Sequence, residues 1–220
     1  DQESYLNAFK ALLETKPTAV IMVPNFSEET EKIIAQLEEL NIPYLFLNID
    51  IKDFKNITYV GQDSYSAGYI AGKLMHLNNR NATEFLIIQS SHNITKNNAV
   101  SNRMEGFKDY FIKNNINSKT QNLKIDNLNN FEETKEKINT YLKNHPEIKG
   151  IFVPSSRIYT VVDSTEPALL KNINLIGFDN TPQNIACLLN DTVSFLISQK
   201  PFDQGYESIR LLTDYLIHNK

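Results

Sequence analysis

Short apolar runs of strand length alternate along the chain with segments in which apolar residues recur at helical spacing. Leu6, Phe9 and Leu13 have the helical spacing, and residues 19–23 form a continuous apolar run. The next helix is expected from Ser27, whose hydroxyl can cap it and which precedes acidic residues in the first turn. The chain therefore opens with a helix–strand–helix pattern.

The same alternation continues to the end of the chain. Further strands are predicted at 44–47, 57–60, 85–88, 123–125, 151–153, 173–176 and 193–197. Helices are expected near 97–115, 131–144, 157–165 and 203–217, and after the strand at 57–60, where the apolar face is Ala67, Ile70, Ala71, Leu74 and Leu77. Asn130 and Glu133 form a capping-box-like pair before the helix at 131–144. Apolar strands separated by helices indicate a parallel sheet covered on both faces, so the fold class is α/β.

Composition and charge narrow the range of functions. The 220 residues carry a net charge of -4 and no long run of Lys or Arg, which argues against a nucleic-acid footprint on these residues themselves. No apolar stretch approaches the roughly 20 residues that span a bilayer, so no contact with a membrane is expected. The single Cys187 permits no internal disulfide, as in a reducing compartment but also as in many exported binding proteins.

Motifs for catalysis and for cofactor binding are missing from the sequence. There is no Gly-x-Ser-x-Gly elbow and no phosphate-binding glycine-rich loop. The histidines His76, His92, His145 and His218 are scattered without metal-ligand spacing, and Cys187 fits a small core residue better than a nucleophile. We therefore expect neither an enzyme nor a bound cofactor or metal.

Four stretches carry a family resemblance. They are GQDSYSAGYIAGKLM (61–75), NRMEGFKDYF (102–111), INLIGFDNTPQN (173–184) and VSFLISQKPFDQGY (193–206). In their order and separation, across nearly the whole chain, they resemble the effector-binding module of the LacI/GalR family of transcriptional regulators, which has a type I periplasmic-binding-protein-like fold. The resemblance implies a receptor for a small molecule, a sugar in particular.

The resemblance also implies a domain organisation that periodicity does not show. Two doubly wound parallel-sheet lobes would be joined by a hinge, with residues 1–80 plus 199–220 in the N-terminal lobe and 81–198 in the C-terminal lobe. The chain would cross near Arg80 and return near Ser198. In the family a strand–helix–strand segment would precede Asp1 and a few strands would follow Lys220, so the N-terminal lobe is expected to be incomplete.

Two aspartates occupy the ends of predicted strands, where ligands of open parallel sheets bind. Asp63 follows the strand at 57–60 and Asp179 follows the strand at 173–176. Both match family positions that face the cleft, and a carboxylate there can accept hydrogen bonds from neighbouring sugar hydroxyls. The competing interpretations are a helix N-cap for Asp63 and a turn or hinge residue for Asp179.

Arg103 and Gln199 are the other main candidates for ligand contact. Arg103 matches a family arginine that reaches into the cleft, where its planar fork of donors suits two acceptors at once; a surface ion pair with Glu105 or Asp109 is the alternative. Gln199 lies where the last strand leaves the second lobe, at a family position that contacts ligand or hinge. Pro201 is expected to start the last helix.

Three further positions are weaker candidates for ligand contact. Asn25 and Phe26 end the first strand, and the Phe26 ring could stack on a sugar face or belong to the core. Ser155, with Ser156, departs from the Asn-Asp that many family members carry after this strand. Its shorter hydroxyl reaches less far, which puts a direct sugar contact in doubt.

The resemblance implies a ligand-sensing domain of a LacI/GalR-type regulator that binds a small carbohydrate between its two lobes. Such a protein would be a cytoplasmic homodimer that contacts DNA through a helix-turn-helix region not present in this chain. The alternative from the same architecture is an exported sugar-binding protein that serves a transporter or a sensor.

Overall fold

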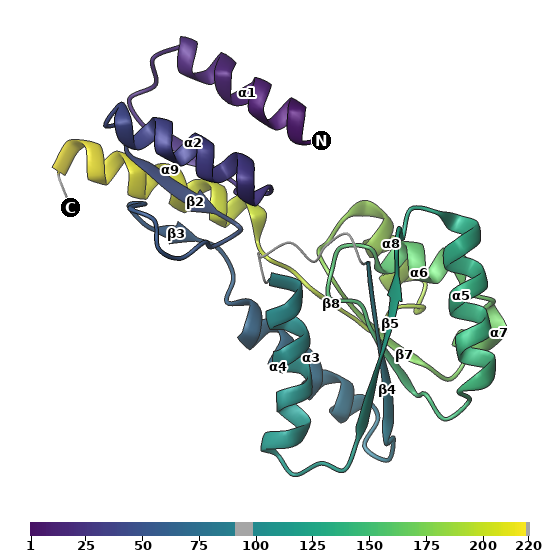
Figure 1. Ribbon diagram of the computed structural model, residues 1–220. Coiled ribbons are helices and arrows are strands. Elements are labelled where there is room, and N and C mark those ends of the chain that lie inside the picture. The colour runs from purple at the N-terminus through teal and green to yellow at the C-terminus, as the bar shows by residue number, and fades with distance from the viewer. Residues whose placement is uncertain (91–98, 219–220) are drawn as a thin grey trace. The chain divides into compact units, whose positions relative to one another are not determined.

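Two compact α/β units make up the chain (Figure 1). The computed structural model describes residues 1–90 and 99–218. The first unit contains Asp1–Gln62 and the C-terminal helix, and the second contains the described residues from Asp63 to Gln199. Each unit has a parallel sheet flanked by helices, so the predicted fold class is confirmed.

The first unit is built on a three-stranded sheet with the order β1-β2-β3. Its elements are α1 (Gln2–Glu14), β1 (Val20–Met22), α2 (Ser27–Glu39), β2 (Tyr44–Leu47), β3 (Tyr59–Val60) and α9 (Pro201–His218). Tyr44 and Phe46 pack in one cluster with α1 and α2 residues. Leu45, also fully buried, points to the opposite face because side chains alternate along a strand. The helix α9 contacts β2 and β3.

The second unit is built on a five-stranded sheet with the order β5-β4-β6-β7-β8. Its strands are β4 (Glu84–Ser90), β5 (Lys119–Ile125), β6 (Gly150–Phe152), β7 (Asn174–Phe178) and β8 (Phe195–Ile197). Its helices are α3 (Ser64–Asn78), α4 (Ala99–Lys113), α5 (Phe131–Asn144), α6 (Ile158–Ser164), α7 (Pro167–Leu170) and α8 (Pro182–Leu189). All strand pairs are parallel, so the carboxyl ends of the strands lie along one edge of the sheet.

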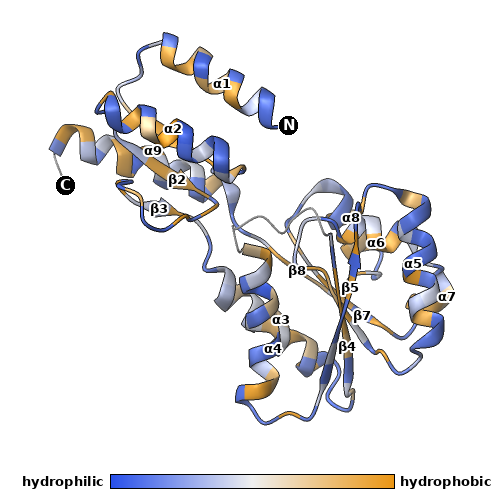
Figure 2. Cartoon of the chain, in the orientation of Figure 1, coloured by the Kyte–Doolittle hydropathy of each residue, from blue (hydrophilic) through white to orange (hydrophobic). Residues whose placement is uncertain are grey.

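Both faces of this sheet are buried by helices. In β4, Phe85 and Ile87 belong to the cluster that α3 and α4 cover, whereas Leu86 and Ile88 belong to the cluster under α5 and α6. The helices are amphipathic, and α2 and α5 alternate between polar and apolar colours in Figure 2. The continuous apolar run predicted at 85–88 therefore reflects burial on two sides rather than a hydrophobic period of two.

Glycines bring α3 and α4 into backbone contact. A Cβ at Gly68 would lie 2.0 Å from the Arg103 carbonyl oxygen, and one at Gly106 would lie 2.1 Å from the Tyr65 carbonyl oxygen. This packing makes α3 part of the second unit, so the division after Gln62 differs from the expected crossing near Arg80.

The close approach of α3 to α4 also explains why the buried side of α3 differs in part from the apolar face that the sequence predicted. The buried residues are Ala67, Gly68, Ala71, Gly72 and Met75. Ile70 and Leu77, which were expected on the apolar face, are about half exposed, at 51% and 49%. The predicted face is therefore confirmed at Ala67 and Ala71 and wrong at Ile70 and Leu77, because backbone proximity to α4 requires the smallest side chains.

Most predicted boundaries agree with the structure to within a few residues. The Ser27 cap is wrong, because Ser27 is the first helical residue and Phe26 occupies the N-cap position without a side-chain bond. The helices α7 and α8 were not predicted, since each is short. Residues 97 and 98 of the predicted helix near 97–115, and His92, lie outside the described residues. Pro201 does start the last helix.

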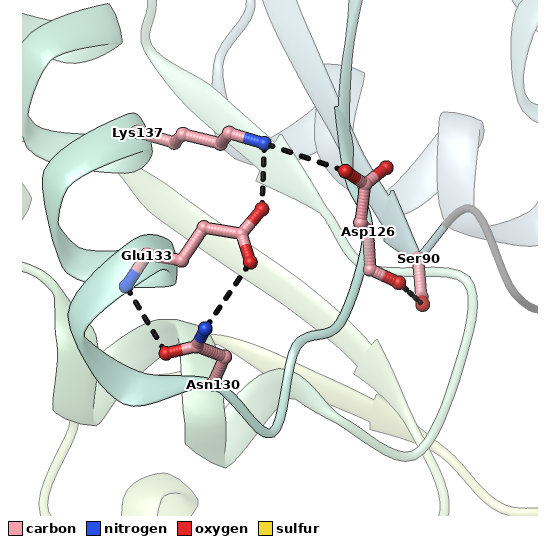
Figure 3. Close-up of polar contacts among 5 residues, drawn as sticks. All are labelled: Ser90, Asp126, Asn130, Glu133 and Lys137. Atoms are coloured by element: carbon pink, nitrogen blue, oxygen red, sulfur yellow. Dashed lines mark hydrogen bonds and ion pairs between the residues drawn. The ribbon is translucent and has the colours of Figure 1, made fainter.

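The predicted cap of α5 is confirmed (Figure 3). The Asn130 side-chain oxygen accepts the Glu133 backbone N–H at 3.4 Å, and the Asn130 amide nitrogen lies 3.4 Å from the Glu133 carboxylate. Lys137 pairs with Glu133 at 2.6 Å and approaches Asp126 at 4.0 Å. Asp126 in turn is joined to β4 through its carbonyl oxygen, which accepts the Ser90 hydroxyl at 3.1 Å. The start of α5 is thereby connected to the ends of β4 and β5.

Replacing Asn130 with alanine is expected to lower the free energy of unfolding by about 1 kcal/mol, because one backbone donor of the first turn loses its partner. Urea denaturation followed by circular dichroism measures this loss. Asn129→Ala is the control, since its exposed side chain lies outside the cap. Equal losses in the two variants would contradict the cap's contribution.

Candidate functional site

The carboxyl-terminal edge of the second unit's sheet brings together several predicted residues. Pro154 and Ser155 follow β6, Asp179 follows β7 and Gln199 follows β8. The three strands are neighbours in the sheet, so the loops after them start side by side. Arg103 reaches the same edge from α4.

Arg103 is a buried cation at this edge, with only 5% of its surface exposed. One terminal nitrogen donates to the Pro154 carbonyl oxygen at 3.0 Å, and the other donates to the Gln199 side-chain oxygen at 2.8 Å. The guanidinium carbon lies 4.0 Å from the centre of the Phe178 ring, within the range of a cation–π contact. The guanidinium plane is therefore fixed by contacts from three strand ends.

Gln199 connects this cation to a carboxylate. Its amide nitrogen donates to an Asp179 carboxylate oxygen at 2.7 Å, while its amide oxygen accepts from Arg103. The Asp179 backbone N–H donates to the Ile197 carbonyl oxygen at 2.9 Å, which continues the pairing of β7 with β8. Three residues that were singled out separately in the sequence thus form one hydrogen-bonded chain, Arg103–Gln199–Asp179.

Asp179 has an unusual backbone conformation, with a φ of 68°. This left-handed region is uncommon for residues other than glycine, although Asp and Asn tolerate it better than most. Asp179 thus combines a left-handed backbone conformation with membership of the polar chain.

Ser155 lies at the same edge of the sheet, but its side chain is not part of the Arg103–Gln199–Asp179 chain. Its hydroxyl oxygen is buried and has no hydrogen-bond partner among residues 1–90 and 99–218. Buried hydroxyls normally form a hydrogen bond, so a ligand group that bonded to this oxygen would remove the cost of burying it without a partner. The neighbouring Ser156 contributes its carbonyl oxygen, which accepts a bond from Asn184.

Asp63 acts as the N-cap of α3. Its carboxylate accepts the Ser66 backbone N–H at 3.0 Å and the Ser66 hydroxyl at 2.5 Å. These bonds from Ser66 hold the pKa of Asp63 below its usual value. The capping interpretation thus describes the contacts of this side chain, and nothing in its geometry links it to the Arg103–Gln199–Asp179 chain.

Asn25 and Phe26 belong to the first unit. The Phe26 ring meets Tyr5 edge-on, with 5.5 Å between ring centroids, and Asn25 donates its backbone N–H to Val23 at 2.9 Å. They follow β1 at the carboxyl edge of the first unit's own sheet.

One polar residue at the second unit's edge was not predicted. Asn184, on α8, is completely buried and bonds to the loops after both β6 and β7. The sequence did contain a signal for this helix, because Thr181 and Pro182 are typical N-cap and N1 residues. The helix was missed because it is short and its apolar residues, 185–189, form a continuous run without helical spacing.

The remaining reactive side chains do not gather at this edge. Burial raises the pKa of the Cys187 thiol, which keeps it protonated and weakly nucleophilic. Within residues 1–90 and 99–218, no group of three His, Cys, Asp or Glu side chains could hold a metal ion. In the same ranges, no helix is long and apolar enough to cross a membrane.

A cavity of about 550 Å³ lies at the opposite edge of the sheet. Asn174 and Ser194, at the amino ends of β7 and β8, belong to its wall. Asn174 is separated from Asp179 by the length of β7, roughly 16 Å at 3.3 Å per residue. The cavity is therefore distinct from the edge that holds the predicted residues.

Comparison with known proteins agrees with this architecture. A Bacteroides fragilis protein provisionally named a LacI transcriptional regulator is 28% identical, with a TM-score of 0.82, over 100% of this chain and 76% of that one. A periplasmic sugar-binding protein of an ABC transporter from Legionella pneumophila has a TM-score of 0.81 at 19% identity, over 100% of this chain and 81% of that one.

A solute-binding protein from Burkholderia graminis, in complex with D-arabinose, has a TM-score of 0.82 at 17% identity, over 100% of this chain and 76% of that one. No curated protein matches the sequence. The family model described as periplasmic binding protein domain matches residues 1–220. The chain therefore belongs to the periplasmic binding protein domain family.

Proposed function

We propose that the carboxyl edge of the second unit binds a small neutral carbohydrate. The observation that carries this proposal is the Arg103–Gln199–Asp179 chain, in which a cation, an amide and a carboxylate are joined by bonds of 2.8 and 2.7 Å. A guanidinium supplies only donors, a carboxylate only acceptors and an amide supplies both. Sugar hydroxyls both donate and accept, so they match such a mixed set better than a strongly charged ligand does.

The preorganised state of these residues supports binding with useful affinity. Arg103 is nearly buried and stacked on Phe178, so little side-chain entropy remains to be lost when a ligand binds. The proposal assigns ligand contact to Arg103, Asp179 and Gln199, with Ser155 as a further hydroxyl at the same edge. Asn25 and Phe26 of the first unit are further candidates, and so is Asp63 of the second unit despite its capping bonds.

We further propose that the chain is the ligand-sensing domain of a LacI-type regulator rather than an enzyme. The 28% identity to the Bacteroides fragilis protein supports this choice over the structures at 17% and 19% identity. Such a protein is a cytoplasmic homodimer, and its contact with DNA comes from a helix-turn-helix region outside this chain. The sugar is bound and released unchanged, and its binding energy shifts a conformational equilibrium.

The alternative is an exported sugar-binding protein of a transporter or sensor, which the Legionella and Burkholderia structures favour. The coding sequence upstream of Asp1 separates the two. A helix-turn-helix there, with operator binding by the complete polypeptide, supports the regulator. A signal peptide in its place would contradict the regulator and support the exported protein.

The carbohydrate proposal predicts a large thermal shift with one sugar from a panel of pentoses, hexoses and disaccharides. At a ligand concentration of 100 times Kd, binding stabilises the folded state by about 2.7 kcal/mol. For a chain of this size, that corresponds to an increase in Tm of roughly 5–10 °C. Differential scanning fluorimetry measures the shift, and nucleoside triphosphates are the control. A shift with nucleotides alone would contradict the proposal.

A further inference from the structure

Asn184 is a polar side chain with no exposed surface in a position surrounded by loop backbone. Its amide nitrogen lies within hydrogen-bonding distance of three carbonyl oxygens, those of Phe178 at 2.9 Å, Asp179 at 3.0 Å and Ser156 at 3.1 Å. Its amide oxygen accepts the Tyr159 backbone N–H at 3.2 Å. A single side chain therefore uses both ends of its amide on main-chain groups from two loops and from the start of α6.

The two loops are the ones that carry the candidate site. The loop after β6 holds Pro154, whose carbonyl oxygen accepts a hydrogen bond from Arg103, and the buried hydroxyl of Ser155, which has no partner among the described residues. The loop after β7 holds Asp179, which accepts from Gln199. Because Asn184 bonds to both loops, it fixes the distance between the Arg103 end and the Asp179 end of the polar chain.

The backbone of Asp179 needs such support. Residues other than glycine favour negative φ angles, so contacts with the surrounding structure must maintain the φ of 68° at Asp179. The bond from Asn184 to the Asp179 carbonyl oxygen acts on this residue directly, and the bond to Phe178 acts on the residue before it.

We propose that Asn184 is the positioning residue of the ligand site: it holds the loops after β6 and β7 in register and so presents Asp179 and Gln199 to the ligand. The proposal rests on the proposed carbohydrate function for its affinity readout. Asparagine suits this position because its amide has two N–H donors for the carbonyl oxygens and a carbonyl acceptor for the backbone N–H. An aspartate would face those carbonyl oxygens with a second acceptor, and an alanine would leave them buried without a donor.

Asn139 provides a matched control within the same unit. It is 5% exposed, and its amide nitrogen donates to the carbonyl oxygens of Lys135 at 2.8 Å and Ser164 at 3.1 Å. Its amide oxygen accepts the Glu166 backbone N–H at 2.8 Å. It is thus also a buried amide that bonds to main-chain groups at both ends, but it joins α5 to the end of α6 rather than the two site loops.

The experiment compares Asn184→Ala, Asn184→Asp and Asn139→Ala with the wild type, using the carbohydrate that gives the largest thermal shift. Isothermal titration calorimetry at a temperature where all four proteins are folded measures Kd. Both alanine variants are expected to melt at lower temperature. Only the two Asn184 variants are expected to bind at least 10-fold more weakly. Wild-type affinity in Asn184→Ala, or an equal loss in Asn139→Ala, would overturn the proposal.

A second measurement requires no ligand and keeps this inference separate from the proposed function. The side-chain amide signals of Gln199 in a ¹H–¹⁵N spectrum report the bonds to Arg103 and Asp179. These signals are expected to move in Asn184→Ala and to stay in place in Asn139→Ala. If no sugar binds the wild type, the carbohydrate proposal fails while this comparison still decides the positioning role. Unchanged Gln199 signals in Asn184→Ala would refute it.

Discussion

Replacing Arg103 with alanine is expected to abolish the carbohydrate-induced thermal shift. The substitution removes the charge-assisted hydrogen bonds to Pro154 and Gln199 and the contact with Phe178. Each hydrogen bond of a charged group is worth roughly 1.5–3 kcal/mol, and each 1.4 kcal/mol changes affinity about tenfold. Loss of comparable contacts to the ligand would therefore weaken binding by about 100-fold or more.

Arg103→Lys separates the charge from the shape of the guanidinium. Lysine keeps the positive charge but lacks the planar fork, so it cannot bond to Pro154 and Gln199 in the same geometry. We expect intermediate affinity for this variant by calorimetry. Arg210→Ala is the control, because Arg210 is an exposed α9 residue paired with Glu207 and Asp214. Wild-type affinity in Arg103→Ala would contradict the site assignment.

Replacing Gly68 with alanine is expected to destabilise the fold by about 3 kcal/mol. The new Cβ would lie 2.0 Å from the Arg103 carbonyl oxygen and 2.6 Å from its Cα. These are backbone atoms of α4, so the clash can be relieved only by moving one helix away from the other, which is a large overpacking effect. The Tm is expected to fall by roughly 6–12 °C, as measured by calorimetry or circular dichroism.

Gly205→Ala is the matched control for this clash. Gly205 is also within a helix, but a Cβ there would meet nothing within 4 Å. Alanine at this position is expected to stabilise the protein by roughly 0.5–1 kcal/mol, because it reduces the entropy of the unfolded chain and favours the helix. Equal effects of the two substitutions would show that α3 and α4 are not in backbone contact.

The order of the elements could be predicted because each one has a local signal. The boundaries of α5 follow from the Asn130 cap and the period of its apolar residues, and those of β2 follow from a short apolar run. The contact face of α3 could be predicted only in part, at Ala67 and Ala71. Ile70 and Leu77 have the right spacing but are about half exposed, because the glycine side of the helix packs against α4.

In the candidate site, too, some features could be predicted from the sequence and others depend on contacts between distant segments. Position at the end of a strand pointed to Asp179 and Gln199, since polar groups there converge at one edge of a parallel sheet. The family resemblance pointed to Arg103, which lies on a helix. Spacing along the chain contains no information on which of them bond to one another. From the sequence, Arg103 could form either a surface ion pair or a ligand contact. In the structure it is buried and bonds to Pro154 and Gln199, so three segments that are far apart in the chain meet at this side chain.

By itself, the sequence determined the α/β class, the succession of helices and strands and the residue types at the strand ends, because hydrophobic period, caps and turn residues act over a few neighbouring positions. Only the tertiary structure decided that α3 belongs with the second sheet, that Arg103 bonds to Pro154 and Gln199 and that Asn184 bonds to two separate loops. These outcomes depend on contacts between residues far apart in the chain, whose energies no local pattern records.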